Sequence, residues 1–135
     1  ELSHRLATRV AVLNGGDLPT VKKHFDLVRS MCEARSKLIH GTPYVTKPSG
    51  RLTELVGDEG FIRIPPDYLF RFSNLIRASI LYVIALQDRP RSEILDILDR
   101  SQFDPSEVAG VRKSANEYWG LPSCEDEMLC AARWI

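Results

Sequence analysis

The 135 residues of the chain carry no net charge, because 18 lysines and arginines balance 18 aspartates and glutamates. Hydrophobic residues make up 44% and charged residues 27%, which is typical of a folded domain and excludes a disordered chain. The length predicts one domain, and the neutral charge excludes a protein that coats nucleic acid through a general basic surface. Any contact with RNA is therefore expected to be local.

The cysteines and the start of the chain bear on its compartment. Cys32, Cys124 and Cys130 are an odd number and form no C-x-x-C pair, which predicts a reduced, cytoplasmic chain rather than a disulfide scaffold. No run of uncharged residues reaches the roughly 18 of a membrane span, and a signal-peptide layout is lacking, so we expect no membrane partner. The chain opens without methionine in a helical pattern. We interpret it as a trimmed piece of a longer protein, with a sensor module fused outside it or supplied separately.

Two helices are predicted at the start. The first helix has one apolar face, which consists of Leu2, Leu6, Val10 and Leu13 at spacings of four, four and three. The Asn-Gly-Gly run at 14–16 is expected to end this helix. Asp17 is the expected N-cap of the second helix. This helix runs to about His40, and Gly41 is expected to be the residue just after its end.

An irregular excursion, 42–64, follows the second helix and contains three glycines and two prolines among polar residues. A long helix is predicted at 65–87, and it is apolar on much of its circumference. Such a helix sits in the middle of a bundle or faces a second subunit. A short helix is predicted at 92–100, and a D-x-x-E capping box at Asp104 is expected to start a further helix to Trp119.

A last cap at Ser123 predicts a final helix to Ile135. The predicted fold is therefore all-α, a bundle of five or six helices with one irregular excursion. We assign 1–102 to the helical core and 103–135 to a C-terminal helical extension of the same domain.

The most informative residue is Arg35, a cation in the second helix. It lies on a predicted apolar stripe of that helix, which consists of Val21, Phe25, Val28, Cys32, Arg35 and Ile39. A buried guanidinium needs compensation. One interpretation is a structural Arg35 that bridges to Glu33, Asp26 or a carboxylate on another helix, and the other is a phosphate site. His40 lies about 140° and about 7.5 Å further along the helix. Local unwinding at its end would be needed to bring the two side chains together, and without it His40 only complements the helix dipole.

The wider string at 31–41, MCEARSKLIHG, resembles the R-x4-H motif of HEPN domains, and in particular the "RSKIVHG"-type string of their Apea-like branch. The opening ELSHRLATRVAVLNG is similar to the first helix of that branch, and the proline-led helix from Pro65 is similar to its next long helix. The resemblance covers roughly the first 100 residues.

The resemblance implies a HEPN-like helical bundle that forms a homodimer, so that two motifs face one cleft, and metal-independent RNA cleavage in many members. It assigns Arg35 and His40 as the catalytic pair. Ser36 takes the polar position beside the arginine, where many nuclease members carry asparagine, aspartate or histidine. Serine is usual there in the Apea-like branch.

The residue types suit this chemistry. Attack by the RNA 2′-hydroxyl requires a proton acceptor, stabilisation of charge on the phosphorus, and a proton for the leaving 5′-oxygen. Histidine transfers protons near neutral pH, and arginine presents a fork of donors to phosphate oxygens. The histidines show no metal-ligand spacing, so we expect no metal and no cofactor.

Supporting or RNA-contacting roles are predicted for Glu33 and Lys37 and for Tyr44, which lies between Lys37 and the basic residues Lys47 and Arg51. The alternative interpretation of that segment is a solvated loop.

Three functions are compatible with these observations. The first is an endoribonuclease that acts as a homodimer on RNA, as the toxic effector of a stress or antiviral defence protein. The second is a non-catalytic HEPN scaffold for dimerisation or nucleotide binding, which the neutral charge and Ser36 favour. The third is a plain helical interaction domain with an accidental motif. Arg35 and His40 exposed on opposite sides of the helix would support the third.

Overall fold

The computed structural model describes residues 2–48 and 50–120. They form α1 (Leu2–Asn14), α2 (Leu18–Ile39), η1 (Gly50–Leu55), α3 (Pro66–Ala85), α4 (Arg91–Arg100), η2 (Pro105–Val108) and α5 (Ala109–Tyr118), where η denotes a 3-10 helix. The predicted all-α class is confirmed. Within this part of the chain there is no strand, and the extended backbone is limited to two isolated bridges. The final helix predicted at 123–135 lies outside the described residues.

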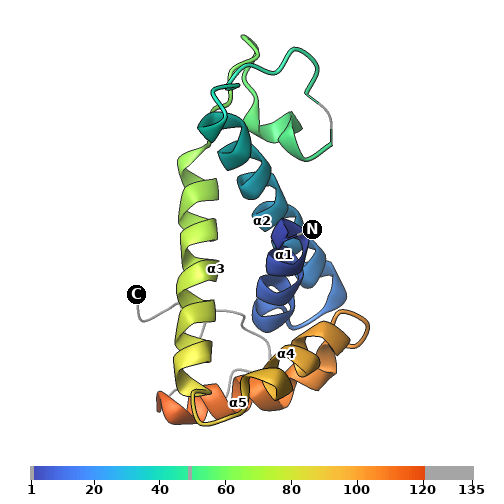
Figure 1. Cartoon of the computed structure of the whole chain (residues 1–135), viewed down its shortest axis with the longest axis vertical. Helices are drawn as coiled ribbons and strands as arrows, with labels where there is room; N and C mark the ends of the chain where they lie inside the picture. The colour runs from blue at the N-terminus through green and yellow to red at the C-terminus, as the bar shows by residue number, and fades with distance from the viewer. Residues whose placement is uncertain (1, 49, 121–135) are drawn as a thin grey trace.

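The long helices α2 and α3 converge at the end of the molecule that carries the 42–64 excursion, and α4 and α5 cross the opposite end (Figure 1). α1 packs along the first part of α2. The interior forms three hydrophobic clusters, one at each end and one between them. Their central residues are Val12, Tyr82 and Val111 near α5, Val28, Met31 and Leu75 in the middle, and Ala34, Leu52 and Leu55 under the excursion.

The turn between α1 and α2 is tight because it is built around a glycine without space for a side chain. A Cβ on Gly15 would overlap the Cγ2 atom of Val21 and lie 2.9 Å from the carbonyl oxygen of Ala11, whereas a Cβ on Gly16 would meet nothing within 4 Å. The predicted cap of α2 is confirmed, since Asp17 accepts a hydrogen bond from the Thr20 N–H at 2.7 Å.

We therefore expect Gly15→Ala to lower the free energy of unfolding by about 1–3 kcal/mol, because a side chain forced into a filled site strains its neighbours. Gly16→Ala is the matched control, and we expect it to change stability by less than about 0.5 kcal/mol. Urea unfolding of both variants checks this. Equal effects of the two substitutions would contradict the assigned packing.

A polar junction joins α1 to the other helices. The buried Asn14 amide donates to the Val10 carbonyl and to the Ser79 hydroxyl of α3, both at 2.8 Å. The Arg112 guanidinium of α5 donates to the carbonyl of Gly15, beyond the last turn of α1. A cation at this position complements the negative end of the helix dipole and satisfies a carbonyl that the helix leaves unpaired.

The capping box at Asp104 has a different structure from the prediction. Asp104 accepts a hydrogen bond from the Ser106 N–H at 3.0 Å, but it caps the 3-10 helix η2, and α5 begins only after it. The Glu107 carboxylate, expected to bond back to the cap, lies 3.4 Å from the Arg100 guanidinium of α4. The single helix predicted from 104 to Trp119 is therefore divided in two.

Two leucines anchor the excursion to the bundle. Leu52 and Leu55 in η1 are 3% and 0% exposed and pack against Ala34 of α2. The bridge between Tyr44 and Phe61 pairs the two arms of the excursion. The segment is irregular, as predicted, and its centre is part of the hydrophobic core.

The helix α3 is long and apolar enough to cross a membrane by length and composition, with a mean hydropathy of 1.2. From the sequence we expected no such segment, because we required an uncharged run, and α3 contains Arg71 and Arg77. One such helix is by itself a weak indication, and 17% of its apolar window is buried inside the structure. Its packing against α1, α2 and α5 is compatible with a soluble protein.

Candidate functional site

The end of α2 that carries the R-x4-H string projects past α1. The first turn of α1 meets α2 at Phe25 and Arg29: the His4 and Phe25 rings are 5.2 Å apart, and Arg29 donates to the Ser3 hydroxyl at 2.6 Å. Beyond this level α2 continues to Ile39 without α1 beside it. η1 packs against these turns, and Tyr68 of α3 packs against the same cluster around Ala34.

Arg35 is exposed, which corrects the expectation that it lies on a buried apolar face. Of the stripe only Val28 is fully buried, and Val21, Phe25 and Cys32 are half-buried. The buried residues of α2, among them Leu27, Met31 and Ala34, centre on a neighbouring side of the helix. Arg35 and Ile39 therefore reach solvent, and Ile39 is 61% exposed. In the part of the chain that the structure describes, Arg35 forms no ion pair, and an exposed guanidinium does not require one.

The end of α2 is regular up to the histidine. The His40 N–H donates to the Ser36 carbonyl at 3.1 Å, which is the bonding of a continuing α-helix. Gly41 then adopts a φ of 68°, and the Thr42 N–H bonds the Lys37 carbonyl at 2.9 Å. This is the Schellman arrangement that a glycine after the last helical turn favours, so the predicted end at Gly41 is confirmed.

This regularity keeps Arg35 and His40 apart within one chain. Because the helix does not unwind before His40, the two side chains leave it about 140° apart in direction. Among the described residues no hydrogen bond joins them. Both are exposed, and the pair is assembled only if something outside one copy of the domain brings the two groups together.

The other predicted residues lie at two places. Ser36 and Lys37 are exposed in the last turn of α2, near His40 in sequence. Tyr44 is 53% exposed just after that turn, with its ring 5.4 Å from that of Phe61 in an edge-to-face contact. Glu33 is half-buried, and it lines a groove on the side of α2 away from Arg35.

Four large apolar side chains are exposed at the same end of the bundle as the motif. Leu38 and Ile39 belong to the last turn of α2 and are 45% and 61% exposed. Leu69 and Phe70 belong to the start of α3 and are 47% and 67% exposed. We call these four the exposed end residues. Several large apolar side chains exposed together mark a surface suited to contact with another protein.

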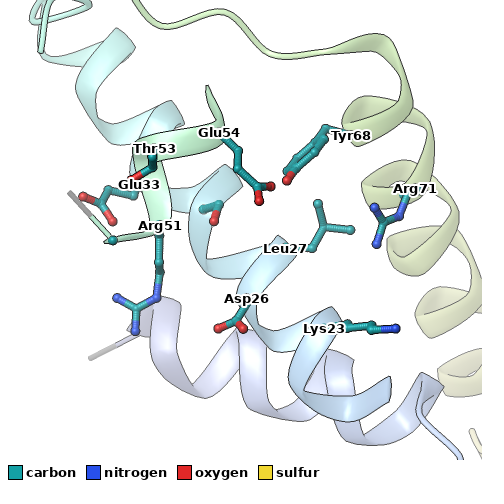
Figure 2. A pocket seen from close by; sticks show the side chains of 11 residues that line it. Lys23, Asp26, Leu27, Glu33, Arg51, Thr53, Glu54, Tyr68 and Arg71 are labelled. Atoms are coloured by element: carbon teal, nitrogen blue, oxygen red, sulfur yellow. The ribbon is translucent and has the colours of Figure 1, made fainter. Parts of the chain in front are cut away.

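A groove of about 830 Å³ runs between α2, η1 and α3 (Figure 2). Lys23 and Arg71 lie on one side of it, and Arg51 and Glu33 lie on the other. The groove was not predicted from the sequence. The polar residues Lys23, Asp26, Ser30 and Glu33, which recur along one side of α2, were the signal that could have indicated it. It is lined by Lys23, Asp26, Leu27, Ser30, Glu33, Gly50, Arg51, Thr53, Glu54, Tyr68 and Arg71.

The groove presents both signs of charge to the solvent. Within the described residues no ion pair joins its three cations to its three carboxylates. The Arg71 guanidinium lies 5.9 Å from the centre of the Tyr68 ring. Of the predicted site residues only Glu33 lines this groove, so the groove and the R-x4-H motif are separate features of α2.

A buried histidine adjoins the groove. His24 is 5% exposed, and burial, together with the positive charges of Arg71 and Lys23, lowers its pKa from 6.5 to about 4. Loss of hydration disfavours the charged imidazole, and nearby cations disfavour it further. His24 is therefore neutral at pH 7. Its burial was not apparent from the sequence, because histidine tolerates both surface and interior positions.

Over residues 2–48 and 50–120, no group of three histidine, cysteine, aspartate or glutamate side chains is placed to hold a metal ion. No protein-family model, curated protein or solved structure matches the chain. The functional argument therefore rests on the motif and on the geometry of the site.

Proposed function

We propose that the chain is a HEPN-type, metal-independent endoribonuclease domain that acts on RNA as a homodimer. It serves as the effector part of a stress or phage-defence protein in the cytoplasm. The observation that carries this proposal is the exposure of both Arg35 and His40 at the projecting end of α2, where RNA and a second copy both have access to them. The all-α bundle and the RSKLIHG string at a helix end agree with the resemblance on which the proposal is based.

The geometry of α2 supports the proposal of a dimer. Arg35 and His40 diverge within one chain, so one copy does not present both groups to the same phosphate. Two copies that meet through the exposed end residues provide two arginines and two histidines around one cleft. In that cleft His40 transfers the proton, Arg35 stabilises charge on the phosphate oxygens, and Lys37 and Tyr44 contact the strand.

The divergence also supports the second function, a HEPN scaffold that dimerises without cleaving RNA. The neutral charge agrees with it. The same exposure on different sides of α2 is the feature that favours a plain helical interaction domain, and such a domain neither cleaves RNA nor needs His40. Activity and oligomeric state together separate the three functions.

We expect the domain at micromolar concentration to sediment as a particle of about twice the 15.3 kDa of one chain. Ile39→Glu is expected to produce a monomer, because a charge in an apolar interface is costly to bury. Leu18→Glu is the matched control, since Leu18 is 58% exposed at the opposite end of α2. A wild-type monomer, or dissociation by Leu18→Glu alone, would exclude the composite site.

The activity is tested with purified domain and RNA in EDTA. Attack by the 2′-hydroxyl needs no metal ion, and it leaves a 2′,3′-cyclic phosphate on the upstream fragment. We expect cleavage in EDTA with these ends. A requirement for added magnesium, or upstream fragments that end in a 3′-hydroxyl at the cleavage site, would contradict the mechanism.

A further inference from the structure

The groove between α2, η1 and α3 has two cations on its α3 side that lack a counter-charge. Figure 2 shows Lys23 of α2 and Arg71 of α3 on this side. Among the described residues no ion pair joins either of them to a carboxylate. Both positive charges act on the buried His24 imidazole, so both lie close to it. Because two neighbouring cations repel each other, an anion that binds between them is favoured.

The two cations differ in a way that suits a phosphate group. The Arg71 guanidinium lies 5.9 Å from the centre of the Tyr68 ring, and it offers a planar fork of donors. The Lys23 ammonium offers a compact charge with three donors. Phosphate oxygens accept hydrogen bonds from both kinds of donor, and arginine and lysine commonly bind phosphate in proteins.

The rest of the groove is lined by groups that accept hydrogen bonds. Asp26, Glu33 and Glu54 contribute carboxylates, which only accept when they are ionised. Figure 2 shows Glu54 pointing toward the hydroxyl end of Tyr68, and the buried Ser30 contributes a hydroxyl. Hydroxyl and ammonium groups are the donors that such a lining recognises. A long polyanion such as RNA is disfavoured there, because its further phosphates would lie beside carboxylates.

We propose that this groove binds a small phosphate monoester whose remaining part carries hydroxyl or ammonium groups. Lys23 and Arg71 bind the phosphate, and Asp26 and Glu54 accept hydrogen bonds from the remaining part. The volume of about 830 Å³ lies within the range of about 300–1,000 Å³ that is typical of small-molecule sites. The groove is separate from the R-x4-H motif, so this inference does not depend on the proposed nuclease activity.

Three probes test the groove in the full chain by titration calorimetry: inorganic phosphate, glucose 6-phosphate and phosphoethanolamine. We expect at least one ester to bind at least about tenfold more tightly than inorganic phosphate, because only an ester also contacts the carboxylates. The two esters separate the two kinds of donor, since glucose 6-phosphate offers hydroxyls and phosphoethanolamine offers an ammonium group.

Single substitutions assign the two halves of the ligand. Lys23→Gln and Arg71→Gln are each expected to weaken binding of the preferred ester at least about tenfold. Glu54→Gln is expected to reduce the preference for the ester over inorganic phosphate by at least about threefold. Lys22→Gln is the matched control, since Lys22 is the next residue, is exposed and does not line the groove. It is expected to bind within about twofold of wild type. Lys23, Arg71 and Glu54 are exposed, so the variants are expected to fold, which circular dichroism checks.

The three histidines of the chain locate the bound ester by NMR. Under this proposal the imidazole signals of His24 shift, because the two cations that bind the phosphate act on its ring. The signals of His4 in α1 and of His40 in the R-x4-H motif stay unchanged. A shift of His40 alone would place the phosphate at the motif and overturn the proposal. Esters that bind no more tightly than inorganic phosphate, or binding that Arg71→Gln leaves unchanged, would overturn it as well.

Discussion

His40→Ala is expected to lower the rate of RNA cleavage by at least about 100-fold while leaving the fold and the dimer intact. The imidazole is the only group of the RSKLIHG string that transfers a proton near neutral pH, and removal of a positioned proton-transfer group costs 100-fold or more. The fold is expected to persist because His40 is exposed and its backbone bond to Ser36 does not involve the side chain. Single-turnover cleavage in EDTA measures the rate, and circular dichroism with sedimentation checks the fold and the mass.

His4→Ala is the matched control, since His4 is also exposed but lies on α1, where α1 meets Phe25. It is expected to cleave at the wild-type rate. Cleavage that persists in His40→Ala would exclude the proposed mechanism. If wild type forms the dimer but does not cleave, the scaffold function is favoured instead.

Two substitutions of Arg35 distinguish a functional role of its guanidinium from a structural one. Arg35→Lys keeps the charge but loses the planar fork of donors, so its cleavage rate is expected to fall by about 100-fold. Arg35→Ala is expected to change the free energy of unfolding by less than about 0.5 kcal/mol, because the side chain is exposed and forms no ion pair among the described residues. A stability loss of several kcal/mol would instead indicate a buried structural partner.

The ends of the helices were predictable because local residues determine them. Asp17 satisfies an N–H three residues ahead, and Gly41 supplies the positive φ that the end of α2 requires. Each of these interactions spans only a few residues, so it is present in the sequence pattern itself. The all-α class follows in the same way from the apolar spacing of the individual helices.

The environment of Arg35 was not predictable, because it depends on which side of α2 the other elements cover. The apolar spacing placed Arg35 on a stripe of which only Val28 is fully buried, whereas Ala34, the residue before Arg35, is 0% exposed. The groove depends on three elements, α2, η1 and α3, that only the tertiary fold brings together. The predicted hydrogen bond from the Glu107 side chain back to the cap at Asp104 was wrong for a related reason. The Glu107 carboxylate instead pairs with the Arg100 guanidinium of another helix, α4.

The buried histidine leads to the second large expected effect, a loss of stability in mild acid. The pKa of His24 is about 4 in the folded protein and close to 6.5 when burial is removed. Between these values the unfolded chain binds more protons than the folded one, so stability rises with pH. The contribution of His24 is therefore fully present above about pH 6.5 and is lost as the pH falls toward 4.

Lowering the pH from 7 to 5 is expected to reduce the free energy of unfolding by about 2 kcal/mol through His24 alone. Asp99, whose pKa the Arg9 guanidinium holds below its ordinary value of 3.8, contributes only at lower pH, so the two effects separate. Urea unfolding at pH 7 and pH 5 measures the difference, and His24→Gln, which does not titrate, should lose most of it. If His24→Gln kept the full pH dependence, the exposed histidines or the carboxylates would have to be its cause, and the neutral buried imidazole would be wrong.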